Sequence, residues 1–259
     1  MTIPVSTNYR YFIDLSFDGT AYHGWQVQPN AISVQQILAE ALTTLLREDT
    51  GLTGSGRTDT GVHALNYTAH FNTHASPLQL QEMDLVYKLN RIVPHDLAIQ
   101  QIRQVIPDAH ARFSAQCRSY EYIICRRKDP FMVNRAWLME RPLDFDAMQE
   151  VSRKLMQYKD FESFSRSNTQ VNNYLCNVTS ASWRQEGHLW IFSIQSNRFL
   201  RNMVRALVGT ITDAGLKKIS PCQFDDIVKS KNRSNAGYSV PGCGLYFLGA
   251  EYDDSIFLK

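Results

Sequence analysis

The residues Gly54–Ala64, which read GSGRTDTGVHA, are the densest set of chemically active groups in the chain. Glycine at this density allows positive φ angles and lets a ligand approach the backbone closely. Asp59 is a candidate nucleophile or general base, and Arg57, two residues before it, is a cation that could hold a substrate. A tight turn between two strands would need neither charged group. The stretch therefore predicts a catalytic loop, with Asp59 as the catalytic carboxylate and Arg57 as a substrate-binding residue.

Three other kinds of site share residues with this loop. Gly51–Thr58 is a near match to a phosphate-binding P-loop, but arginine replaces the lysine and no apolar strand precedes it. Asp59-Thr60-Gly61 matches the D-T-G of aspartic proteases, which need two carboxylates, so a protease built on this single copy would have to be a dimer. A metal site would use His63, His70 and His74, with no further carboxylate in the segment to complete the ligands.

A second cluster of cations lies at Asn197–Arg205. Arg198, Arg201 and Arg205 are three and four residues apart, so we expect them to line one face of a helix. Arg205 lies among apolar residues, and a buried arginine needs a carboxylate partner. We expect that partner to be Asp59, whose ionised form the guanidinium would favour.

A third cluster begins with the strand Arg118–Tyr122 and continues through Arg126–Lys128 and Arg135. Aromatic rings interleaved with cations are typical of nucleic-acid surfaces, where rings stack on bases and cations neutralise phosphates. Tyr120 and Tyr122 equally fit the core face of a sheet. A tyrosine at the edge of the site would satisfy both interpretations.

Composition places limits on the class of protein. The chain has 259 residues, of which 44% are apolar, so a sizeable core is possible. Its net charge of only +2 does not by itself indicate a polyanionic partner. Its five cysteines form no C-x-x-C pair, which argues against a disulfide framework or zinc knuckle and fits a reducing cytoplasm. Neither a signal peptide nor a membrane-spanning run is evident. We expect a cytoplasmic protein without membrane attachment.

The elements that must position these clusters alternate between strand and helix. The patterns predict strands at 9–18, 65–71, 97–105, 118–126, 177–184, 189–195 and 245–252, and helices at 33–45, 77–91, 144–156, 199–213 and from 220. One-sided strands and a hairpin favour an α+β fold with antiparallel sheet over a doubly wound parallel sheet. We predict two closely packed halves, 1–106 with the aspartate loop and 107–259 with the tyrosine and the basic helix.

These clusters, in this order, resemble the tRNA pseudouridine synthase A family over nearly the whole chain. The core at Gly56–Ala64 is the most specific part of the match. Further matching segments are Asp18-Gly19, Gly24-Trp25-Gln26, Ala111–Ala115, Tyr120-Glu121-Tyr122, Asn197–Arg205 and Gly244-Leu245-Tyr246. Thr60 stands where many relatives carry alanine, a conservative change.

The resemblance implies a fold and a reaction. The implied fold is two related α+β halves whose antiparallel sheets join into one extended sheet flanked by helices, with the active cleft between the halves. The implied reaction isomerises uridine to pseudouridine at positions 38, 39 and 40 in the anticodon stem-loop of tRNA. Because nothing is oxidised, reduced or lost, no cofactor or metal is expected. The family also implies a homodimer, in which one subunit grips the tRNA body while the other presents its site.

The resemblance further implies a role for each site residue. Asp59 resembles the essential aspartate that starts the isomerisation, and Arg57 resembles the cation that holds the target nucleotide flipped from its stack. Tyr120 resembles the tyrosine that stacks on the flipped base. Arg205 resembles the arginine that pairs with the aspartate, and Leu245 resembles the aliphatic residue under the base.

Two other functions stay open on the sequence. A non-catalytic tRNA-binding module would use the same cations and aromatic rings, and a dimeric aspartic protease would use the single D-T-G. The residues also leave open whether Asp59 attacks C1′ or removes a sugar proton. They assign no role to Trp25, and they favour a structural role for His63.

Overall fold

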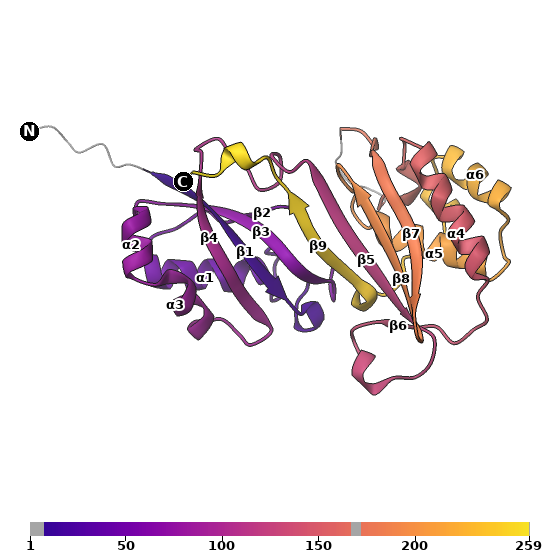
Figure 1. The fold of residues 1–259 in the computed structure, drawn as a ribbon, viewed down its shortest axis with the longest axis horizontal. Coiled ribbons are helices and arrows are strands. Elements are labelled where there is room, and N and C mark those ends of the chain that lie inside the picture. Colours follow the sequence, from indigo (N-terminus) through magenta and orange to yellow (C-terminus); the bar gives the residue numbers. More distant parts are fainter. Residues whose placement is uncertain (1–7, 167–171, 259) are drawn as a thin grey trace, which may run out of the picture. The chain divides into compact units, whose positions relative to one another are not determined.

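The fold is described from a computed structural model, which covers residues 8–166 and 172–258 (Figure 1). The chain forms two compact units. The first takes the residues up to Gln116 together with those from Gly249 onward, and the second is the continuous segment Cys117–Leu248. The chain thus leaves the first unit once and returns to it at its end. The functional division after residue 106 stays a prediction.

The first unit is built on three antiparallel strands. β1 (Tyr9–Phe17) pairs with β3 (His63–Thr73) on one side and with β4 (Leu97–Val105) on the other, and the short β2 (Thr53–Gly54) pairs with β3. The helices of this unit are α1 (Val34–Leu46), α2 (Pro77–Glu82) and α3 (Leu85–Ile92). α3 packs on β4 and on α1, so apolar helix faces cover the strands.

In the first unit α1 begins next to its predicted first residue, whereas the second predicted helix is interrupted. The hydroxyl of Ser33 accepts the Gln36 N–H at the start of α1, and Ser76 forms a complete capping box before Pro77. The single helix predicted for 77–91 is wrong, because Asp84 adopts φ 48° and separates α2 from α3. A left-handed residue ends the first helix, and the Asp84 carboxylate then caps the second.

The prediction of one-sided strands is wrong for β1. Phe12 and Asp14, which alternate with the core residues, are 0% and 2% exposed. The C-terminal segment covers Phe12 through the rings of Tyr252 and Phe257, at 5.0 and 5.9 Å between centroids.

Asp14 is buried but well satisfied. Its carboxylate accepts hydrogen bonds from the Thr68 hydroxyl at 2.6 Å, the Gln101 amide at 2.8 Å and the Arg103 guanidinium at 2.7 Å. These donors lie on β3 and β4, so one carboxylate ties the three strands together. A buried charge is tolerated where it is paired and hydrogen-bonded in this way.

The second unit repeats the combination of antiparallel strands and helices. β5 (Cys117–Cys125) pairs with β8 (Leu189–Ser196), and β8 forms a hairpin with β7 (Val178–Glu186). β6 (Trp137–Leu138) runs parallel to β5, and β9 (Leu245–Glu251) carries the chain out of the unit. The helices are α4 (Phe145–Lys154), α5 (Met203–Gly215) and α6 (Pro221–Lys229). The predicted α+β class, with a large sheet flanked by helices, is confirmed.

The beginning of α5 differs from the prediction. Its first residue is Met203, preceded by Asn202 at φ 66°, so Arg198 and Arg201 precede the helix. The predicted arginine face is therefore wrong, and only Arg205 of the three lies on α5. With 13 residues, α1 and α5 are the longest helices of the part of the chain that the structure describes, and no helix there could cross a membrane.

His70 is a buried base in the first unit. It is 5% exposed on β3, its Nδ1 accepts the Ala111 N–H at 3.2 Å, and its ring lies 4.5 Å from that of His110. Burial, together with the nearby His110 and Arg10, lowers the pKa of His70 from 6.5 to about 4.

This shift predicts a loss of stability in mild acid. Below pH 6.5 the unfolded chain takes up a proton on His70, whereas the folded protein stays neutral there until about pH 4. Stability therefore falls as the pH drops through this window, by up to about 3 kcal/mol. Urea unfolding at pH 7, 5.5 and 4.5 measures the loss, which His70→Gln should reduce. The exposed His23, changed to Gln, is the control, and equal slopes for the two variants would contradict the assignment to His70.

Candidate active site

The predicted catalytic loop is held against the segment that follows β1. A Cβ atom on Gly24, where φ is +89°, would lie 2.2 Å from the Thr58 carbonyl oxygen, and one on Gly19 would lie 2.0 Å from the Val62 carbonyl oxygen. The Gly61 N–H donates to the Tyr22 carbonyl at 3.3 Å. Backbone meets backbone on both sides of Asp59, and glycine is required at both contact points.

His63 fixes one of these contact points. The imidazole is 3% exposed, and its Nδ1 lies 3.1 Å both from the Gly19 nitrogen and from Asp18 Oδ1. A backbone N–H always carries its proton, so Nδ1 is the acceptor of the Gly19 hydrogen bond and has no proton of its own to share with Asp18. His63 therefore holds the segment after β1 in place, in agreement with a structural role.

Tyr67 supports the other end of the loop. Its hydroxyl donates to the carbonyl of Gly56 and accepts the Gly56 N–H at 3.3 Å, so both backbone groups of the residue before Arg57 are engaged. The Trp25 indole stacks on the Tyr67 ring at 4.2 Å between centroids and is 3% exposed. A Cβ on Gly54 would meet both side chains, which makes this a tightly packed support. Trp25, which had no role from the sequence, belongs to it.

Arg57 and Asp59 lie between these two anchors. Arg57 is exposed and Asp59 is partly exposed, while Thr58 between them is buried. The Asp59 carbonyl accepts the Val62 N–H at 3.2 Å across a turn in which Gly61 has φ +74°. The cation and the carboxylate thus share one short, backbone-fixed segment that is open to a ligand.

The three histidines of the metal hypothesis have other contacts. The Nδ1 atoms of His63 and His70 both accept backbone N–H groups, and His74 is 61% exposed and 3.8 Å from Glu48. Within residues 8–166 and 172–258 there is no group of three or more His, Cys, Asp or Glu that could hold a metal ion.

Tyr120 lies on β5 of the second unit with its ring clamped between two others. Phe199 and Phe247 each approach it edge-on, with centroids 5.1 Å away. The ring remains partly exposed, whereas Phe247 is buried. An aromatic ring held in this way is oriented before a ligand arrives.

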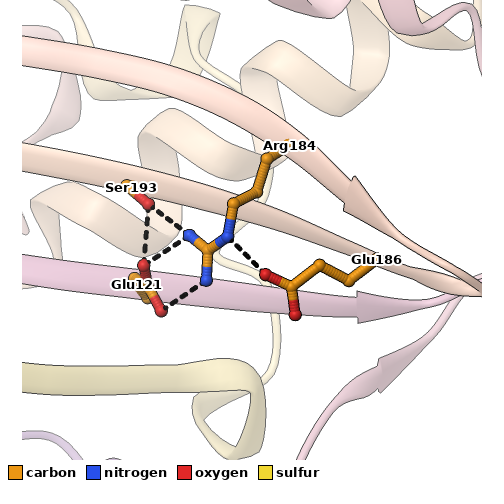
Figure 2. A network of polar contacts seen from close by, with 4 residues as sticks. All are labelled: Glu121, Arg184, Glu186 and Ser193. Atoms are coloured by element: carbon orange, nitrogen blue, oxygen red, sulfur yellow. Dashed lines mark hydrogen bonds and ion pairs between the residues drawn. The ribbon is translucent and has the colours of Figure 1, made fainter.

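A polar network holds the strand beneath Tyr120 (Figure 2). Glu121 faces the opposite side of β5, where Arg184 of β7 binds its two carboxylate oxygens at 2.5 and 3.3 Å and Ser193 of β8 donates to it at 2.8 Å. Arg184 also donates to Glu186 at 2.7 Å. Burial would raise the pKa of Glu121, but the hydrogen bonds from Arg184 and Ser193 outweigh it and lower that pKa. An ionised carboxylate therefore links three strands.

Arg205 lies close to the same strand. Its Nε donates to the Val240 carbonyl at 2.7 Å, and the Tyr122 hydroxyl donates to the carbonyl of Pro241, the next residue, at 2.8 Å. Burial raises the pKa of Tyr122, and the Arg205 guanidinium opposes that rise, which indicates electrostatic proximity. Leu245, 5% exposed, begins β9 two residues before Phe247. Tyr120, Arg205 and Leu245 thus all belong to the second unit.

The predicted site residues fall into two groups. Arg57 and Asp59 belong to the first unit, and Tyr120, Arg205 and Leu245 belong to the second. The pairing of Asp59 with Arg205 stays a prediction. Sequence reasoning missed Tyr67 as a supporting residue, although a tyrosine on an apolar strand face needs a hydrogen-bond partner and a glycine-rich loop offers one.

Comparisons with known proteins extend over both units. A sequence profile described as tRNA pseudouridine synthase matches residues 153–253. The chain is 47% identical to the tRNA pseudouridine synthase A of Bacteroides fragilis over 249 residues, which cover 96% of this chain and 98% of the relative. The proteins of the same name from Bacteroides thetaiotaomicron and Parabacteroides distasonis are 44% and 43% identical over 251 residues, covering 96% of this chain and 92% and 98% of those relatives.

The close approach at Gly24 predicts a large loss of stability for Gly24→Ala. The substitution combines a side chain at positive φ with a collision at Thr58, for a cost of about 2–5 kcal/mol. Gly51→Ala is the matched control, because Gly51 has φ +58° but nothing within 4 Å of its Cβ position. It should cost only about 1–2 kcal/mol. Urea unfolding compares the two, and equal losses would show that the collision is absent.

The Tyr67 support predicts a local effect for Tyr67→Phe. Without the hydroxyl, the amides of residues 55–59 should exchange their hydrogens with solvent at least about fivefold faster, because one hydrogen bond contributes about 1 kcal/mol. Tyr11→Phe removes a comparable hydrogen bond, 3.0 Å to the Ala75 carbonyl, and should leave these amides unchanged. Native-state hydrogen exchange tests the difference. Unchanged exchange in Tyr67→Phe would mean that the loop is held by its other contacts alone.

Proposed function

The chain belongs to the tRNA pseudouridine synthase A family, and on this premise we propose that it isomerises uridine to pseudouridine in tRNA, with Asp59 as the catalytic carboxylate. The enzyme is an isomerase. The proposed targets are uridines 38, 39 and 40 of the anticodon stem-loop, where the family resemblance puts them.

One observation supports Asp59 in particular. The carboxylate lies on a segment whose backbone is anchored before it at Gly56 and after it at Gly61, while Asp59 itself remains partly exposed. A catalytic group acts best when its position is fixed before the substrate binds. A solvated surface aspartate would need neither the glycine contacts nor the Tyr67 support.

Asp59 and Arg57 supply a reactive carboxylate and a cation that the isomerisation can use. The N1–C1′ bond of the uridine breaks, the base turns, C5 forms the new bond to C1′, and the proton that leaves C5 is balanced by one gained at N1. An ionised carboxylate can displace N1 from C1′ and leave again when C5 attacks C1′, or it can remove a sugar proton and return it once the new bond has formed. The exposed Arg57, two residues away, holds the nucleotide after it has left its stack.

The second unit would supply the remaining contacts to the base. Tyr120 offers a partly exposed ring that Phe199 and Phe247 orient, which suits stacking on the flipped uracil. Leu245 offers an apolar side chain two residues before Phe247. Arg205 would pair with Asp59 and favour its ionised form. We further propose that the protein works as a homodimer in the cytoplasm, without a cofactor.

The proposal predicts that Asp59→Asn abolishes turnover but retains tRNA binding. Asparagine keeps the shape of aspartate and removes its charge, so release of tritium from tRNA labelled at uridine C5 should fall below about one thousandth of wild type. Asp108→Asn is the control, because Asp108 is an exposed carboxylate of the same unit. Filter binding of tRNA should change little in either variant.

Two results would refute this assignment. Tritium release by Asp59→Asn at the wild-type rate would remove Asp59 from the chemistry. Tight tRNA binding with no pseudouridine formed by the wild-type protein would instead favour the non-catalytic binding module.

A further inference from the structure

The segment between β5 and β6 contains Phe131, the most exposed large apolar side chain among the residues that the structure describes. This segment, residues 126–136, is called the Phe131 loop, and it extends away from the strands in Figure 1. Phe131 is 79% exposed and Val133 is 65% exposed. An isolated exposed apolar residue needs no explanation, but two at the apex of one loop indicate a contact surface.

The loop is firmly built despite this exposure. The Asp129 carboxylate accepts the Phe131 N–H at 2.9 Å and contacts His188 Nε2 at 2.7 Å, and the backbone of 130–132 forms a 3-10 turn. At the other end the Tyr246 hydroxyl donates to the Arg135 carbonyl at 2.7 Å. The apex is therefore presented in a defined position, which reduces the entropy lost when a partner binds.

The base of the loop rests on the elements that carry the second group of site residues. The Trp137 ring, directly after the loop, lies 6.3 Å from the ring of Tyr122 on β5. Tyr246, which holds Arg135, is the residue after Leu245 on β9. The loop is thus connected to the surroundings of Tyr120 and Leu245 within one compact unit.

The loop carries a high positive charge for its length. Residues 126–136 contain four cations and one carboxylate, a net charge of +3. The whole chain carries +2, so the remaining residues together carry one net negative charge. Arg126 is used internally, since it donates to the Arg141 carbonyl at 2.7 Å and lies over the Trp190 ring. Arg127, Lys128 and Arg135 are exposed.

We propose that the Phe131 loop is a second tRNA contact, separate from the residues that handle the target uridine. Arg127, Lys128 and Arg135 contact backbone phosphates, and Phe131 stacks on an unpaired nucleotide of the same tRNA. This inference rests on the proposed function, because it takes tRNA as the substrate. An exposed ring surrounded by cations is the combination that binds single-stranded nucleic acid without reading its sequence.

The charge favours tRNA over a second copy of this chain as the partner. A two-fold contact between copies through this loop would bring one +3 loop close to another +3 loop. A polyanion has no such penalty. The Phe131 loop therefore holds the tRNA while a uridine elsewhere in the same tRNA is modified.

Binding measured in the Asp59→Asn background tests the contact without any need for turnover. In that background, Phe131→Ala should weaken the Kd for full-length tRNA about tenfold, because stacking on one base contributes that order of affinity. Arg127→Ala with Lys128→Ala should reduce the slope of log Kd against log salt by about 2, one for each phosphate that is no longer neutralised. In the otherwise wild-type enzyme, both changes should raise KM and leave kcat within about twofold.

The matched control is a similar group on α3. Tyr87, 60% exposed, is followed by the exposed cations Lys88 and Arg91, so Tyr87→Ala and Lys88→Ala with Arg91→Ala remove the same chemistry elsewhere. These controls should change neither Kd nor the salt slope. Thermal unfolding of every variant checks that the fold is intact.

Three outcomes would overturn the proposal. The first is a Phe131→Ala protein that binds tRNA as tightly as its parent. The second is equal effects from the α3 variants. The third is a change in sedimentation coefficient for Phe131→Ala without tRNA, which would make the loop a contact between subunits. If the wild-type enzyme forms no pseudouridine but the loop variants still weaken tRNA binding, the proposed function fails and the contact stands.

Discussion

The contact between two backbone segments, 19–24 and 58–62, is the constraint on which the candidate active site depends. Peptide groups meet with no room for a Cβ atom, so the position of Asp59 is set by main-chain atoms. His63 then fixes Gly19, and Tyr67 with Trp25 fixes Gly56. On the segment between these supports Arg57 is exposed and Asp59 is partly exposed. The glycine-rich loop is therefore held in one conformation, because neighbouring backbone and side chains pack closely against it and hydrogen-bond to it.

Each unit uses the same physical device to lock its strands. In the first unit the Asp14 carboxylate on β1 accepts hydrogen bonds from β3 and β4. In the second the Glu121 carboxylate on β5 accepts them from β7 and β8 (Figure 2). Both carboxylates bind an arginine and a hydroxyl. Asp14 lies on β1, between β4 and β3, and Glu121 lies on β5, beside β8 and two strands from β7. A charged group across a sheet resists sliding of the strands, since a shift of one residue would leave it unpaired.

Local patterns predicted most elements, because caps and periodicity are short-range signals. The helices expected from 77 and from 220 begin at Pro77 and Pro221, and the strands expected at 177–184 and 189–195 form a hairpin. The failures came from longer-range effects. Nothing near Phe12 in sequence indicates that Tyr252 covers it, and nothing near Asp84 or Asn202 announces a positive φ. For the site, the motif predicts Asp59 and Arg57, whereas the supports at Gly19, Gly24 and Tyr67 depend on contacts between distant segments.

The return of the chain to the first unit has a consequence for biogenesis. The second unit is one continuous segment, whereas the core around Phe12 is finished by Tyr252, Ile256 and Phe257. A ribosome therefore completes all residues of the second unit before it makes those that close the first. The unit that carries Asp59 is therefore the last to have all its residues available. A nascent or prematurely terminated chain that lacks these last residues would thus leave the core around Phe12 open, although every residue of the second unit has been made.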